Sequence, residues 1–146
     1  MQTFLPYPSF RKSAHCLDCR RLGKQRLEAV QILTLLRNPV RRQHSRYRNH
    51  PAIRMWEGYE EALTQYIRAV ILQWIDRDHE NNMLIPDPLI DPLLPEWWGG
   101  PIHAAHRARL LAKDPGHYEQ FGWTESPTLD SYWPVPTRRN PNPRRQ

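Results

Sequence analysis

The sequence is poor in the features that mark secreted, membrane-spanning and disulfide-stabilised proteins. It has two cysteines in 146 residues, too few for a disulfide framework. No apolar run approaches the length that crosses a bilayer. The first residues, MQTFLPYPSF, lack the charged start and long apolar stretch of a signal peptide. We therefore expect an intracellular, cytoplasmic protein without a transmembrane segment.

Motifs of several enzyme classes are also missing. There is no glycine-rich phosphate loop, no His-Glu-x-x-His motif and no run of acids spaced for a two-metal nuclease. If the chain acts on nucleic acid, we expect it to do so without a metal. No internal repeat is visible, and the length fits a single domain with one core.

The two cysteines, Cys16 and Cys19, leave two interpretations open. Together with His44 and His50 they could complete a Cys2His2 zinc site, which needs four ligands. However, no second Cys-x-x-Cys exists, and a redox pair would need a βαβ context that is absent. We favour two reduced, partly buried cysteines, and we expect no metal or other cofactor.

Positive charge is concentrated toward the two ends of the chain. Residues 11–48 carry 11 Lys and Arg against 2 acids, residues 49–100 carry 3 against 9, and residues 101–146 carry 7 against 4. If the ends meet in space, they form a basic face backed by an acidic one. Such a face suits DNA or RNA. A membrane surface fits less well, because no basic helix here has a strongly exposed apolar face.

The segment DCRRLGKQRLEAVQILTLLR, residues 18–37, predicts the first long helix. Asp18 can cap its N-terminus. Apolar positions recur at spacings of three, four and seven; they are Leu22, Ala29, Val30, Leu33 and Leu36. Glu28 is an isolated acid among the cations of this helix. It either pairs with Lys24 across one turn on a solvated face, or is the one carboxylate kept for chemistry on an anion-binding surface.

The remaining patterns predict an all-α fold, a compact single domain of three main helices joined by long irregular connections. Pro51 suits the first position of the second long helix, which we expect to continue to about His79 on one apolar stripe. The third covers residues 102–113. Shorter helices are expected at residues 10–15 and 114–122. The connections are expected at residues 1–8, 40–48, 81–100 and 124–134. Residues 1–134 are expected to form the domain, and residues 135–146 a disordered, basic Pro/Arg tail.

Three segments resemble the pyrimidine-dimer DNA glycosylase family, the phage endonuclease V-like enzymes. They are LDCRRLGKQRLEA, RNHPAIRMWEGYEEALTQY and HRARLLAKDPGHYEQFGW, in the same order, within residues 1–123. The resemblance implies a compact all-α fold and removal of a damaged or modified base from double-stranded DNA, followed by nicking at the abasic site. It leads us to expect a monomer that associates with the nucleoid when it binds DNA.

The resemblance also implies two reactive groups. In the family, the nucleophile is the α-amine of the first residue, and a glutamate on the first long helix works beside it; Met1 and Glu28 match these positions. An α-amine has an ordinary pKa of about 7.7–8.0, so much of it is a free nucleophile near neutral pH. Its attack on the sugar C1′ forms an imine, and a carboxylate beside C1′ can stabilise the cationic sugar and take the C2′ proton.

Two positions depart from the family pattern. The phage enzyme loses its initiator methionine and exposes a small residue, whereas the bulk of Gln2 should block that removal here and leave the amine on Met1. The arginine directly before the family's glutamate is Leu27 in this chain, and Arg26 or Arg21 could take over its phosphate contact.

Other residues are expected to hold the DNA or to line the site. Phosphate contacts are assigned to Arg20, Arg21, Lys24, Arg26, Arg48, Arg107, Arg109 and Lys113. Site-lining candidates are Gln25, His50, Trp97, Trp98, His103, His106 and Tyr118. Their aromatic members could fill the space left by a displaced base, whereas each histidine is more commonly a capping or packing residue. Two alternatives stay open: a nucleic-acid-binding protein without catalysis, and a helical domain whose charge serves solubility.

Overall fold

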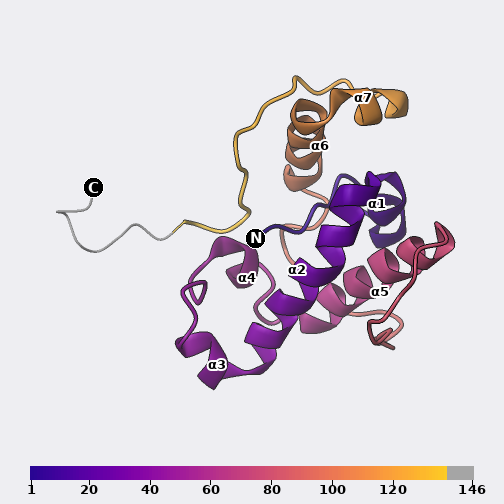
Figure 1. Ribbon diagram of the computed structural model, residues 1–146. Helices are drawn as coiled ribbons and strands as arrows, with labels where there is room; N and C mark the ends of the chain where they lie inside the picture. Colours follow the sequence, from indigo (N-terminus) through magenta and orange to yellow (C-terminus); the bar gives the residue numbers. More distant parts are fainter. Residues whose placement is uncertain (138–146) are drawn as a thin grey trace.

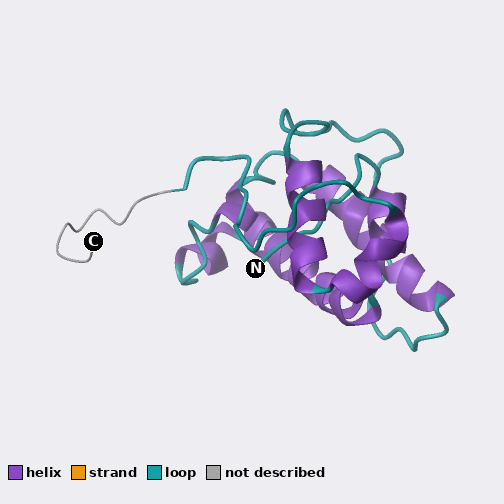
Figure 2. Cartoon of the chain, turned by 90° about the horizontal axis from the view of Figure 1, so that it is seen from above, coloured by secondary structure: helices purple, strands orange, loops and turns teal. Residues whose placement is uncertain are grey.

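The computed structural model describes residues 1–137, and this part of the chain contains helices and no strand (Figure 1; Figure 2). The all-α prediction is confirmed. Residues 138–146, most of the tail predicted to be disordered, lie outside the described residues. None of the described helices is long and apolar enough to span a membrane.

Two long helices form the centre of the fold. They are α2 (Cys19–Arg37) and α5 (Glu60–Asp76), which pack against each other, with α1 (Phe10–Cys16) packed on α5. The third predicted helix, α6 (Ile102–Lys113), has the expected bounds. The remaining helices are short: α3 (Pro39–Gln43), α4 (Pro51–Arg54), α7 (Pro115–Tyr118) and a 3-10 turn over Glu119–Phe121.

Helix α2 begins where the sequence predicts, because the Asp18 carboxylate accepts a hydrogen bond from the Arg21 N–H at 3.3 Å. Its predicted buried face is wrong in the second half. The buried positions are Leu22, Gln25, Ala29, Ile32 and Leu35, whereas Val30, Leu33 and Leu36 are only partly buried. The buried face of α2 includes Gln25, and a polar residue at this position concealed which side of the helix faces the core.

The prediction of one continuous helix from Pro51 to about His79 is wrong. Gly58 has φ +83°, a left-handed conformation that interrupts the helical ladder between α4 and α5. The apolar stripe nevertheless enters the core on both sides of the break, as the complete burial of Trp56 and Leu63 shows. The predicted loop over residues 40–48 likewise begins with α3, because Asn38 caps a new helix through Arg41 N–H.

The N-terminal arm is extended, as expected, but it is buried rather than superficial. Thr3, Phe4 and Leu5 are at most 7% exposed. No strand pairs with them in the described residues, so side chains of neighbouring helices satisfy their backbone groups. The Gln25 amide accepts from Phe4 N–H at 2.8 Å and donates to Gln2 C=O at 2.9 Å. The Tyr66 hydroxyl lies 2.9 Å from Phe4 C=O.

Helix α6 holds the next residue of the arm through two histidines. His103 Nδ1 donates to Leu5 C=O, and Leu5 N–H donates to His106 Nδ1, each at 2.8 Å. Burial lowers the pKa of His106 to about 3, and the charges of His103 and Arg109 add to that shift, so its ring stays neutral and can accept. Both histidines therefore pack and pin the arm, the more common of their two predicted roles.

We predict that Gln25→Leu destabilises the protein by about 2–4 kcal/mol, because the Phe4 N–H and the Gln2 C=O lose their partners together. The matched control is Gln31→Leu, the same substitution at an exposed position of α2, which should change stability by less than about 0.5 kcal/mol. Urea denaturation measures both. Equal midpoints for the two variants would show that the arm does not depend on this amide.

Candidate active site

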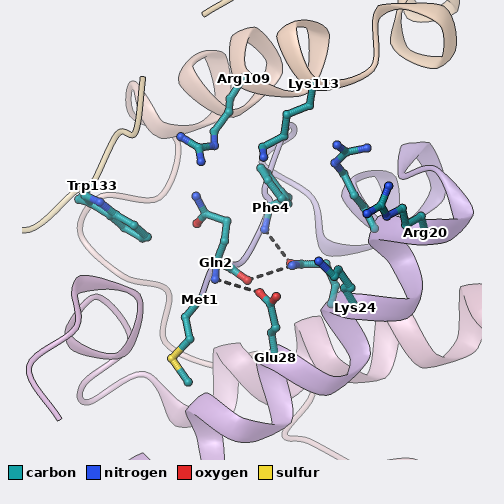
Figure 3. A pocket seen from close by; sticks show the side chains of 11 residues that line it. Met1, Gln2, Phe4, Arg20, Lys24, Glu28, Arg109, Lys113 and Trp133 are labelled. Atoms are coloured by element: carbon teal, nitrogen blue, oxygen red, sulfur yellow. Dashed lines mark hydrogen bonds between the residues drawn. The ribbon is translucent and has the colours of Figure 1, made fainter. Parts of the chain in front are cut away.

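A pocket of about 300 Å³ opens between the N-terminal arm, the first half of α2, and α6 (Figure 3). The two basic regions of the sequence meet here, so the lining holds five cations around one carboxylate. The lining residues are Met1, Gln2, Phe4, Arg20, Arg21, Lys24, Gln25, Glu28, Arg109, Lys113 and Trp133.

The carboxylate of this pocket is bound to the beginning of the chain. Gln2 N–H donates to Glu28 Oε2 at 3.0 Å, which places the Met1–Gln2 peptide group against the acid of α2 (Figure 3). The charge of the α-amine also acts on the side chain of His50. Burial lowers the pKa of that ring, and the positive charge of the chain terminus lowers it further. The first residue therefore folds back onto the protein near Glu28 and His50, and Met1 is partly buried.

The positive charges of the pocket lie close enough to one another for their electrostatic potentials to add. Arg109 and Lys113 point into it from α6, opposite α2 (Figure 3). Burial lowers the pKa of Lys113, and the charges of Arg109, Arg21 and Lys24 lower it further. Asp18 neutralises only part of this field, through an ion pair with Arg21 at 3.1 Å. Such a concentration of positive charge favours an anionic ligand with several charged groups, as a nucleic acid backbone has.

Three of the eight cations predicted to contact phosphate lie outside the pocket. Arg26 stacks on the Trp74 ring at 4.1 Å. Arg48 donates to a backbone carbonyl of its own turn. Arg107 pairs with Glu125 and donates to the arm. DNA contacts by these three residues stay predictions.

The aromatic residues expected to line the site are placed in the packing around it. Trp97 donates to Met55 C=O and packs on Trp56, and Trp98 packs against Phe10. Tyr118 is fully buried, and its hydroxyl donates to the Asp18 carboxylate. None of the three predicted aromatic residues lines this pocket.

Trp133, which lines the pocket together with Phe4, was not predicted from the sequence. It belongs to the segment after α7, which returns along α6 toward the N-terminus (Figure 1). Thr128 N–H donates to Ala108 C=O, Arg109 donates to Leu129 C=O and Ser131 Oγ, and the Trp133 ring meets His50 edge-on at 5.4 Å. The only sequence signal was an aromatic pair in a segment without periodicity.

The two cysteines differ in burial, whereas the sequence predicted that both would be partly buried. Both are free; Cys16 is buried and Cys19 is exposed. Burial raises the pKa of the Cys16 thiol to about 12, which makes it unreactive. Within residues 1–137, no three His, Cys, Asp or Glu side chains gather in a way that could hold a metal ion, and the four residues of the alternative zinc site are not brought together.

Comparison with known proteins identifies a family. The sequence model of a family described as pyrimidine dimer DNA glycosylase matches residues 1–87. The matched region supplies the arm, Glu28 and the cations of α2, whereas α6 and Trp133 follow it in the chain. No curated protein and no solved structure matches significantly.

We predict that Lys24→Gln weakens binding to a duplex DNA fragment and reduces the slope of log affinity against log salt by about one, because one phosphate contact releases about one counterion. The control is Arg37→Gln at the other end of α2, where the guanidinium is exposed and pairs with Glu61. Fluorescence anisotropy at several salt concentrations gives both slopes. A salt slope for Lys24→Gln equal to that of the unsubstituted protein would remove Lys24 from the interface.

Proposed function

The chain belongs to the pyrimidine dimer DNA glycosylase family, and from this premise we propose that it removes a damaged or modified base of the pyrimidine-dimer class and then nicks the abasic strand. The observation that carries the proposal is the hydrogen bond from Gln2 N–H to Glu28 Oε2, which holds the first residue against the acid of a cationic pocket. We propose a monomer as the acting form.

The proposed reaction starts with the lone pair of the Met1 α-amine. It attacks the sugar C1′, the bond from C1′ to the base breaks, and the base leaves with the bonding electrons and is protonated. Opening of the sugar ring then gives an imine between Met1 and C1′. Loss of a proton from C2′ breaks the C3′–O bond, and the 3′ phosphate leaves, which nicks the strand.

Glu28 has two tasks in this scheme. As a carboxylate it stabilises the positive charge that develops on the sugar, and it accepts the proton from C2′. The five cations would bind the phosphates on either side of the sugar and stabilise the departing phosphate. The same arrangement would also suit a binding protein without catalysis, in which Glu28 only anchors the arm. Detection of the covalent intermediate distinguishes the two functions.

Borohydride trapping provides that separation. With duplex DNA that contains an abasic site, we expect a covalent adduct whose mass equals that of the protein plus the reduced DNA strand minus the water lost when the imine forms. Acetylation of the α-amine should abolish the adduct, because the nucleophile loses its lone pair, while DNA binding persists. Peptide mapping should locate the link at Met1. Binding without any adduct or base release would establish the non-catalytic alternative.

We also predict that Glu28→Gln lowers turnover by about 100-fold or more while DNA affinity stays within about threefold. An amide still accepts from Gln2 N–H, so the arm keeps its anchor, but it cannot take a proton. Base release from duplex DNA with a pyrimidine dimer measures turnover, and thermal unfolding confirms that the variant is folded. Turnover equal to that of the unsubstituted protein would remove Glu28 from the mechanism.

A further inference from the structure

A second hollow, of about 620 Å³, lies on the other side of Met1. Met1 lines both the cationic pocket and this hollow, and so forms part of the wall between them. The hollow is formed by the outer surface of α2 and the segment that includes and follows α3. Its lining residues are Met1, Val30, Gln31, Thr34, Leu35, Arg41, His44, Ser45 and Tyr47.

The hollow differs in character from the cationic pocket and suits a thioether side chain. Val30 and Leu35 give it an apolar wall, and Met1 is among the partly buried apolar residues packed against the core. In Figure 3 the Met1 side chain points away from Arg109 and Lys113, along α2. Methionine is unbranched and flexible, so it can fill an irregular apolar space of this kind.

This placement matters because the backbone hydrogen bonds that hold the arm begin at Gln2, one residue after the one that carries the α-amine. Gln2 N–H is held by Glu28 and Gln2 C=O by Gln25, but the α-amine lies one rotatable bond further toward the chain end. Rotation about the Met1 Cα–C bond moves the amine and the side chain together, since both are attached to the same carbon. If packing at the wall of the hollow fixes the Met1 side chain, it therefore also fixes the direction in which the amine points.

We propose that the Met1 side chain is a positioning group: packed as part of the wall of the hollow between α2 and the segment around α3, it aims its own α-amine into the cationic pocket. The proposal rests on the proposed function, since it assigns a role to the side chain of the same residue. It gives a purpose to a methionine whose removal the bulk of Gln2 is expected to block, in contrast to the small first residue that the family resemblance implies.

The test replaces the side chain and keeps the amine. Met1→Ala and Met1→Leu are released from an N-terminal fusion by a protease that cleaves directly before residue 1, and intact mass confirms each terminus. For Met1→Ala we expect the rate of borohydride trapping at saturating abasic DNA to fall by about 10- to 100-fold, because a misdirected nucleophile rarely reaches C1′. The dissociation constant for DNA should stay within about threefold. Met1→Leu, which restores an apolar side chain to the wall of the hollow, should recover most of the rate.

The outcomes separate this proposal from the one on which it rests. A trapping rate for Met1→Ala equal to that of the unsubstituted protein overturns the anchoring role and leaves the imine mechanism intact. Equal losses of trapping rate in Met1→Ala and Met1→Leu also overturn it, because a large apolar side chain at residue 1 would then not restore the rate. Absence of an adduct with the unsubstituted protein refutes the nucleophile itself. Thermal unfolding of each variant at the same midpoint shows that the fold is retained.

Discussion

A buried, extended chain end, with no strand beside it among residues 1–137, is the constraint on which this structure depends. A backbone N–H or C=O group that is buried without a partner costs about 1–3 kcal/mol. The fold meets this requirement with side chains: Gln25, Tyr66, His103 and His106 each pair with the arm. Polar residues therefore occupy core positions of three helices, α2, α5 and α6, and the three helices are connected through the arm as well as through their apolar faces.

The same bonds bring the beginning of the chain to the acid of α2. Because Phe4 and Leu5 are held on both their N–H and C=O sides, Gln2 can reach Glu28, and the first residue follows it into the cationic pocket. Cations from α2 and α6 surround a single carboxylate there. A nucleophile beside an acid, within a field that attracts phosphates, is the arrangement that the proposed glycosylase and lyase chemistry requires.

Patterns within single segments predicted much of the fold. The cap at Asp18 and the bounds of α6 were predicted correctly, since both depend on neighbours a few residues apart. The break at Gly58 was missed because the apolar stripe enters the core on both sides of it. In the site, Gln25, Lys24 and Lys113 were predicted and do line the pocket, whereas Trp133 was not, since its segment has no periodicity and is held by contacts with α6 and α4.

The sequence by itself determined the all-α class, the concentration of cations toward both ends of the chain, and the isolated acid on the first long helix, because these are properties of composition and local spacing. The tertiary structure alone decided that the arm is buried, that α6 closes the pocket over α2, and that Met1 lies between two cavities. These arrangements depend on hydrogen bonds between residues up to about a hundred positions apart, such as Leu5 with His106. No local pattern records such pairs, since each partner is an ordinary residue of its own segment.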